Sequence, residues 1–114
     1  MSEDLREKLF DKKENGWKKV NDEEKKKIFE YSKGYMDFLN KAKTEREFVK
    51  NAKELADKNG FKDIMEFNTL KPGDKVYFVN RNKSMYLAII GTESIENGLH
   101  IIGSHVDSPR LDLK

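Results

Sequence analysis

The sequence predicts an α/β fold, with helices over residues 1–68 and strands over residues 75–105. Two observations support this division. Apolar residues recur at helical spacing in the first part, whereas alternating, β-rich segments dominate the last third. A Pro-Gly turn at residues 72–73 separates the two patterns. A chain of 114 residues is long enough for one domain with a modest core.

The composition predicts a globular segment with a charged surface. Charged residues make up 39% of the chain, but 23 Lys and Arg nearly cancel 21 Asp and Glu, and the net charge is only +2. Seven Phe, four Tyr and one Trp supply core material, which disordered segments lack. The near-neutral balance gives no electrostatic footprint for nucleic acid, so we expect no nucleic-acid partner.

The chain contains no cysteine, which excludes disulfides, thiolate nucleophiles and cysteine-ligated zinc. Any metal must therefore be bound through nitrogen and oxygen. The first residues are charged where a signal peptide would be apolar, and no run approaches the roughly 18 apolar residues of a membrane span. We therefore expect a cytoplasmic protein without a membrane partner.

Helix starts are marked by capping residues. A short helix is predicted from Ser2 to about Lys13. A longer one begins at Asn21, with Glu24 placed to complete its cap, and its predicted apolar stripe consists of Ile28, Tyr31, Tyr35, Phe38 and Leu39.

A further helix begins at Thr44, where Glu47 completes a capping box. Its predicted buried stripe consists of Phe48, Ala52, Leu55 and Ala56. Asn59 and Gly60 then provide the left-handed residue at which helices commonly end.

The strand region begins with a hairpin. Apolar segments at 76–79 and 85–90 flank a polar loop at 80–84. The last predicted strand, 99–104, has Leu99 and Ile101 on one face and Ile102 on the other, which is typical of a strand covered on both sides. Two or three helices and a hairpin would cover only one face, so we expect the chain to be part of something larger.

A candidate metal ligand follows this last strand. His105 and Asp107 are two residues apart, so in an extended segment they point to the same side. A neutral imidazole suits zinc, and a carboxylate bound to its other ring nitrogen would fix the tautomer. His105 would be the ligand and Asp107 its orienter. This spacing alone leaves a surface ion pair as the alternative, and we interpret His100, without a carboxylate two residues away, as a structural histidine.

Four segments in order resemble the N-terminal portion of bacterial members of the aspartyl aminopeptidase family of zinc metallopeptidases. They are Tyr35-x-x-Phe38-Leu39, residues 43–47 (KTERE), residues 71–77 (KPGDKVY) and residues 103–114 (GSHVDSPRLDLK). The resemblance implies an exopeptidase that removes N-terminal, often acidic, residues from peptide substrates. It also implies two metal ions, usually zinc, at the end of a mixed sheet flanked by helices, and a large homo-oligomer.

By this resemblance, His105 matches a metal ligand and Asp107 matches the catalytic-site aspartate that orients it. The family's remaining ligands and its general base lie downstream of the matching region. We therefore expect residues 1–114 to be the N-terminal part of a metallopeptidase catalytic domain, present as an expression fragment, a truncated reading frame or one piece of a split chain. The isolated chain is expected to be inactive. The alternative is a non-catalytic truncated module that self-associates or binds a partner.

Overall fold

The computed structural model describes residues 3–10, 13–107, 111 and 113. The chain divides into two compact units, Met1–Gly34 and Tyr35–Lys114, which are described separately. Among the described residues, no helix has both the length and the apolar character that crossing a membrane requires.

The first unit contains α1 (Glu3–Leu9), the short 3-10 helix η1 (Gly16–Lys18) and the first turns of α2 (Asp22–Lys41). The cap predicted for the long helix is confirmed. The Asn21 N–H donates to the Glu24 carboxylate over 2.8 Å, and the Glu24 N–H donates to Asn21 Oδ1 over 2.8 Å. Of the predicted short helix, Ser2 lies outside the described residues, and α1 ends before Lys13.

The apolar stripe predicted for α2 is largely exposed. Tyr31 is 83% exposed and Tyr35 is 57% exposed, so neither contributes to a core. The aromatic contact in this unit is formed instead by Trp17 and Phe29, whose ring centroids lie 5.8 Å apart in an edge arrangement. Helical spacing predicts which residues share a face, but it does not establish that this face is covered.

In the second unit, α3 (Glu45–Lys58) begins and ends at the predicted residues. The Glu47 N–H donates to Thr44 Oγ1 and the Thr44 N–H donates to the Glu47 carboxylate, each over 3.2 Å. At the other end, Asn59 is the C-cap and Gly60 follows with a φ of +82°. A side chain at this φ would be strained, which is why glycine commonly stands there.

The core of this unit lies between α3 and the neighbouring strand. Its buried residues are Ala42, Val49, Ala56, Val76 and Tyr77. The prediction of Ala56 is confirmed, but that of Leu55 is wrong, because its side chain is 55% exposed. Val49 and Ala56 are seven residues apart, or two turns, whereas Leu55 is rotated by about 100° from Ala56 around the helix.

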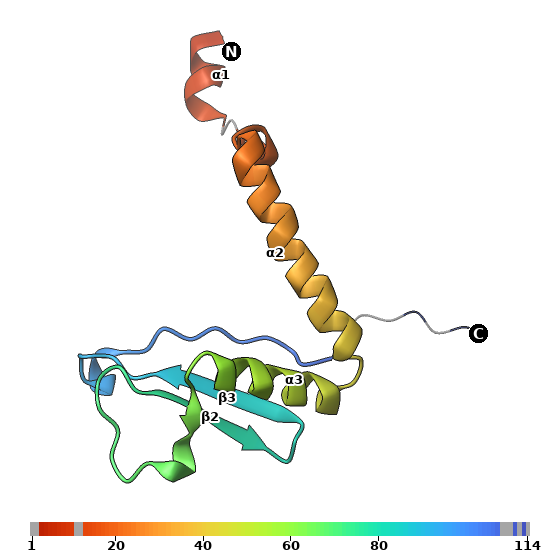
Figure 1. Cartoon of the computed structure of the whole chain (residues 1–114). Coiled ribbons are helices and arrows are strands. Elements are labelled where there is room, and N and C mark those ends of the chain that lie inside the picture. The colour runs from red at the N-terminus through yellow and green to blue at the C-terminus, as the bar shows by residue number, and fades with distance from the viewer. Residues whose placement is uncertain (1–2, 11–12, 108–110, 112, 114) are drawn as a thin grey trace. The chain divides into compact units, whose positions relative to one another are not determined.

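The sheet has three strands in the order β1 (Lys62–Asp63), β2 (Lys75–Asn80) and β3 (Ser84–Ile89). β1 runs parallel to β2, and β3 pairs antiparallel with β2, so the sheet is mixed. Helix α3 lies beside the hairpin formed by β2 and β3 (Figure 1). Helices followed by a mixed sheet confirm the predicted α/β class, and the hairpin strands begin and end within one residue of the prediction.

Two turns connect these strands. Gly73 has a φ of +91°, and its N–H donates to the Ile90 carbonyl over 2.7 Å, so the Pro-Gly turn also closes the base of the hairpin. The β2–β3 turn contains Arg81 and Asn82, with φ values of 51° and 56°. Non-glycine residues seldom adopt positive φ, although asparagine does so more readily than most.

The buried strand predicted over 99–104 is not formed among the described residues. This segment is assigned to no strand, and it follows the 3-10 helix η3 (Ile95–Asn97) as an unpaired chain (Figure 1). Leu99 is 63%, Ile101 80% and Ile102 100% exposed. A strand is defined by its ladder partner, and no described residue pairs with this segment. Conversely, β1 was not predicted, because two residues are too few for a period-two pattern.

Candidate functional site

The two predicted site residues lie together in the structure. His105 and Asp107 are in the unpaired segment that follows η3, and His105 Nδ1 contacts Asp107 Oδ1. Their side chains are 80% and 74% exposed, respectively, while the intervening Val106 is half-buried. This is the alternation that an extended backbone imposes, with residues i and i+2 on one side.

The contact with Asp107 is made through Nδ1 of His105, and this determines which ring nitrogen is available to bind a metal. A carboxylate at Nδ1 favours the proton on that nitrogen, so Nε2 retains the lone pair that a metal ligand requires. The Asp107 carboxylate also restrains the imidazole orientation. The donor set therefore fits the role of one zinc ligand with its orienting carboxylate.

The described residues supply only part of a metal site. They contain no group of three or more His, Cys, Asp or Glu side chains placed to hold one ion. Catalytic zinc usually has three protein ligands, so further ligands would have to come from elsewhere. His100 is exposed and has no hydrogen bond to another described residue, so the structure does not support our interpretation of it as a structural histidine.

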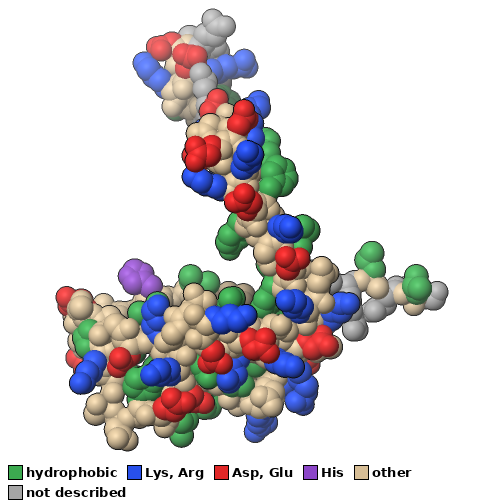
Figure 2. Space-filling view, viewed as in Figure 1, with side chains coloured by type: hydrophobic (Ala, Val, Ile, Leu, Met, Phe, Trp, Pro, Cys, Tyr) green, Lys and Arg blue, Asp and Glu red, His purple; other side chains and the backbone are tan. Residues whose placement is uncertain are grey.

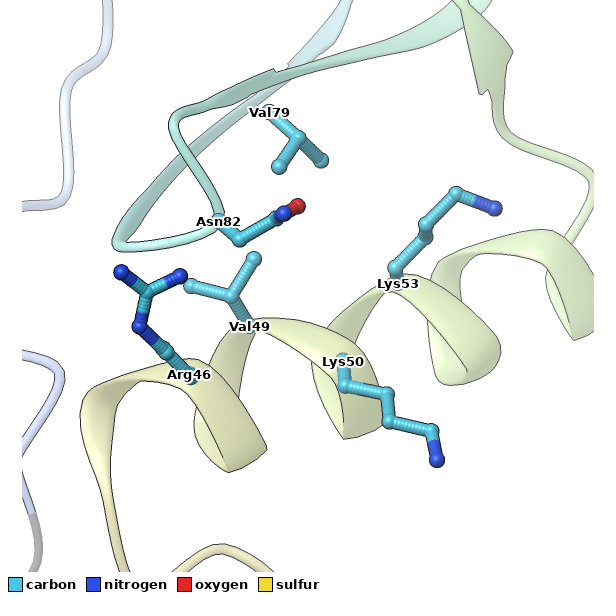
Figure 3. Close-up of a pocket in the computed structure, with 6 residues that line it drawn as sticks. All are labelled: Arg46, Val49, Lys50, Lys53, Val79 and Asn82. Carbon is cyan, nitrogen blue, oxygen red and sulfur yellow. The ribbon is translucent and has the colours of Figure 1, made fainter.

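A groove of about 350 Å³ lies between α3 and the β2–β3 turn (Figure 3). Its lining consists of Arg46, Val49, Lys50, Lys53, Val79 and Asn82. Asn82 extends from the turn into the space between Val79 and Val49, whereas the Lys50 ammonium points away from the turn (Figure 3). The lining contains no carboxylate, imidazole or hydroxyl group, so it offers no acid–base or metal chemistry. We therefore regard the groove as a packing feature beside the core.

The clearest electrostatic perturbation belongs to an ion pair on α3. Lys53 Nζ lies 3.0 Å from Asp57 Oδ2. This hydrogen bond is the main reason why the pKa of Asp57 is lowered and the pKa of Lys53 is raised. Tyr77 reinforces each shift, because it also lowers the pKa of Asp57 and raises the pKa of Lys53. Both charged forms are thereby favoured, which suits a structural pair. Elsewhere, positive and negative side chains are interspersed over the face shown in Figure 2.

Comparison with known proteins identifies a family model that covers both candidate residues. Residues 38–114 match the model described as aminopeptidase I zinc metalloprotease (M18). A probable M18 family aminopeptidase 1 of Borrelia garinii subsp. bavariensis is 50% identical over 103 residues, which are 90% of this chain and 22% of the relative. An aspartyl aminopeptidase of Aspergillus oryzae is 38% identical over 86 residues, or 70% of this chain and 17% of that protein.

A solved structure agrees with the sequence relationship. The crystal structure of aminopeptidase I from Borrelia burgdorferi B31 is 46% identical and superposes with a TM-score of 0.79, covering 89% of this chain and 25% of that chain. The mixed α/β architecture is thus shared with that protein. The present chain spans about a fifth of the length of the curated relatives it matches.

Proposed function

The chain belongs to the M18 family of zinc metallopeptidases, and on that premise we propose that it is the N-terminal segment of a two-metal aminopeptidase. In this proposal, His105 is one zinc ligand and Asp107 is the residue that orients it. The complete enzyme would hydrolyse N-terminal, possibly acidic, residues from peptides. The 114-residue chain by itself would be inactive.

The contact between His105 Nδ1 and Asp107 is the observation that supports this proposal best. It lies within the part of the chain that the zinc-metalloprotease model matches. A histidine ligand whose second nitrogen is bonded to a carboxylate is a recurrent arrangement in zinc proteins. The sequence left a surface ion pair between His105 and Asp107 as the alternative. Such a pair would not require Nε2 to keep a free lone pair.

The roles of this chain's own residues follow from their chemistry. His105 would supply a neutral nitrogen ligand through Nε2. Asp107 would hold the proton on Nδ1 and keep the ring from rotating away. When bound, zinc would supply Lewis acidity toward the scissile carbonyl and toward water. The general base and the other ligands would come from the residues that follow this region in M18 proteins.

The affinity expected from one ligand explains the predicted inactivity. A complete structural zinc site yields about 10–16 kcal/mol. One ligand of four contributes crudely a quarter of that, about 3–4 kcal/mol, which corresponds to roughly millimolar affinity. At this affinity the isolated chain would not retain zinc at the low free concentrations that a catalytic site requires.

Isothermal titration of the 114-residue chain with zinc tests this part of the proposal. The expected result is roughly millimolar binding that is weakened by His105→Ala. The matched control is His100→Ala, because it removes another exposed imidazole from the same segment and leaves the contact between His105 and Asp107 intact. Micromolar or tighter binding that His105→Ala abolishes would show that the site is complete within this chain.

Three finer features remain expectations. Homo-oligomerisation of the longer protein, the use of two zinc ions and a cytoplasmic location come from the sequence and its family resemblance. Peptide substrates follow from the peptidase family, whereas the preferred N-terminal residue is a separate matter for substrate profiling. Nucleic-acid binding is not expected, because the net charge is +2.

A second candidate function is a non-catalytic module that acts by association. The observation that favours it is the exposure of Leu99, Ile101 and Ile102, which lie at 63%, 80% and 100%. Adding this chain to an M18 relative that lacks the corresponding segment distinguishes the two functions. Restored peptide hydrolysis supports the enzyme segment, whereas a stable association without hydrolysis supports the module.

A further inference from the structure

The sequence contains a chemically labile pair of residues in three places. Asparagine is one of the thermolabile residues, and a following glycine makes it more so, because glycine has no side chain to hinder approach to its nitrogen. The three pairs are Asn15-Gly16, Asn59-Gly60 and Asn97-Gly98. All six residues are exposed, so access to water does not distinguish the pairs. The hydrogen bonds within each local segment do distinguish them.

The reaction at such a pair is an attack by the glycine nitrogen on the asparagine side chain. A bond forms between that nitrogen and Cγ, the bond from Cγ to Nδ2 breaks, and ammonia leaves with the amide proton of the glycine. Water then opens the cyclic imide. Opening at one carbonyl gives aspartate, and opening at the other gives isoaspartate, in which the backbone runs through the former side chain. A glycine N–H that is bonded to a carbonyl is held in place, so the first step requires it to be unpaired.

The pair at residues 59–60 is locked into the end of α3. The Gly60 N–H donates to the Asp57 carbonyl over 3.1 Å, and Asn59 Nδ2 donates to the Leu55 carbonyl over 2.8 Å. The Asn59 carbonyl also accepts a hydrogen bond from Lys75 Nζ over 3.2 Å. Imide formation here would have to break bonds to the helix and to β2, so this pair is protected.

The pair at residues 97–98 is held by the turn that ends η3. The Gly98 N–H donates to the Ile95 carbonyl over 3.1 Å. Asn97 Nδ2 donates to the Glu93 carboxylate over 3.4 Å. The attacking nitrogen and the leaving amide are therefore both bonded, as they are at residues 59–60.

The pair at residues 15–16 differs at the attacking nitrogen. Among the described residues, the Gly16 N–H has no hydrogen-bond acceptor, and Asn15 Nδ2 likewise has no described partner. Asn15 Oδ1 accepts from the Trp17 N–H over 3.0 Å, which draws electron density from Cγ and makes it easier to attack. The side chain must still rotate onto the Gly16 nitrogen. Only the three residues of η1 oppose that rotation, and so short a 3-10 helix opens at little cost.

We infer that Asn15-Gly16 is the site at which this chain is modified spontaneously, by conversion of Asn15 to aspartate and isoaspartate. Aspartate keeps a capping oxygen and adds a negative charge, whereas isoaspartate lengthens the backbone immediately before η1. The isoaspartate product therefore displaces the cap from the Trp17 N–H. Trp17 contacts the Phe29 ring and the Lys25 ammonium of α2, so this product should loosen the contact between η1 and α2.

Peptide mapping by mass spectrometry tests the inference on the folded 114-residue chain, incubated at pH 8. Asn15 should convert at least about tenfold faster than Asn59 or Asn97, because their bonds must open first. The same chain unfolded in urea is the reference, since all three pairs should then convert at similar rates. Equal rates in the folded chain, faster conversion at Asn59 or Asn97, or no conversion at Asn15 where the unfolded chain converts would each overturn the inference.

Two variants separate the chemistry from folding. Gly16 has open space around it and no positive φ, so Gly16→Ala fits without strain, yet its methyl group should slow conversion at least about tenfold. Asn15→Ser is the control, because it keeps a capping oxygen and lacks the reactive amide.

Fluorescence follows the consequence for η1, because Trp17 is the only tryptophan of the chain. Its emission should change as isoaspartate accumulates and stay constant in Asn15→Ser over the same incubation. An unchanged conversion rate in Gly16→Ala would overturn the proposed attack by the Gly16 nitrogen. Constant emission in a chain that has accumulated isoaspartate would overturn the proposed loosening of η1.

Discussion

The ammonium group of Lys53 lies 5.3 Å from the centroid of the Tyr77 ring. Lys53 is on α3 and Tyr77 is a buried residue of β2, so this cation–π contact joins the helix to the sheet. The same ammonium group is paired with Asp57 one turn further along the helix. The three side chains form a polar border along the edge of the core.

This border predicts a loss of stability in acid. Asp57 has a pKa below its usual value because it accepts a hydrogen bond from Lys53, so its contribution is present above the pKa of the unfolded chain. It is lost as the pH falls through the lower folded-state pKa. Urea unfolding between pH 6 and pH 2 should show this loss as a fall in the free energy of unfolding. The fall should be smaller in Asp57→Asn, because this variant lacks the titrating carboxylate. Asp37→Asn, which changes an exposed carboxylate on α2, is the control, and equal acid profiles for the two variants would contradict the assignment.

The opposite sign applies to Lys53. Its pKa is raised above the usual 10.5, chiefly by the hydrogen bond to Asp57. The contribution of its charged form is therefore present at neutral pH and is lost only as the pH rises through the raised folded-state value. Between pH 6 and pH 9 this group should cause no change in the free energy of unfolding, which the same urea series measures.

Truncation of the core should distinguish the observed stripe of α3 from the predicted one. Val49 is buried at 2% exposure, so Val49→Ala removes packed methyl groups and should cost about 1–3 kcal/mol of unfolding free energy. Leu55 is 55% exposed, so Leu55→Ala should cost within about 0.5 kcal/mol. Urea denaturation at low protein concentration measures both. A larger cost at Leu55 than at Val49 would show that the helix is rotated from its described orientation.

The helix start at Thr44 gives a prediction of capping energy. Thr44→Ala removes the acceptor for the Glu47 N–H and should destabilise the second unit by about 1 kcal/mol. Thr44→Ser keeps the hydroxyl group and should retain most of the stability. Thermal or urea unfolding provides the comparison, and an unchanged midpoint for Thr44→Ala would contradict a stabilising role for this cap.

Local signals were sufficient to predict much of the fold. The caps at Asn21 and Thr44, the stop at Gly60 and the turn at Gly73 each depend on a few neighbouring residues, and all were predicted correctly. The hairpin was also predicted, because its alternating strands and polar loop are contiguous in the sequence. Such features depend on short-range hydrogen bonds that the local residues themselves provide.

Features that depend on distant partners were predicted less well. The segment at 99–104 has the composition of a buried strand, yet no described residue pairs with it. β1 was not predicted, because its two residues form a strand only through their pairing with β2. For the candidate site, period-two geometry correctly placed His105 beside Asp107, whereas the other ligands of a zinc site have no counterpart among the described residues.

The role proposed for Asp107 can be tested in a complete enzyme. A chimera would carry this chain in place of the corresponding segment of the Borrelia burgdorferi aminopeptidase, to which it is 46% identical. Asp107→Asn preserves size but weakens the bond that orients His105, and should lower metal affinity or activity by about 10–100-fold. Asp37→Asn is the control. Zinc titration of the chelator-treated chimera and peptide hydrolysis would measure the effect, and wild-type values for Asp107→Asn would remove this residue from the site.

The central claim is that His105 is a metal ligand whose partners lie outside this chain. The most direct test is the zinc content of the same chimera after dialysis, measured by mass spectrometry for His105→Ala and for the His100→Ala control. We predict that His105→Ala loses zinc and peptide hydrolysis while the control retains both. Full zinc content and activity in His105→Ala would contradict the claim.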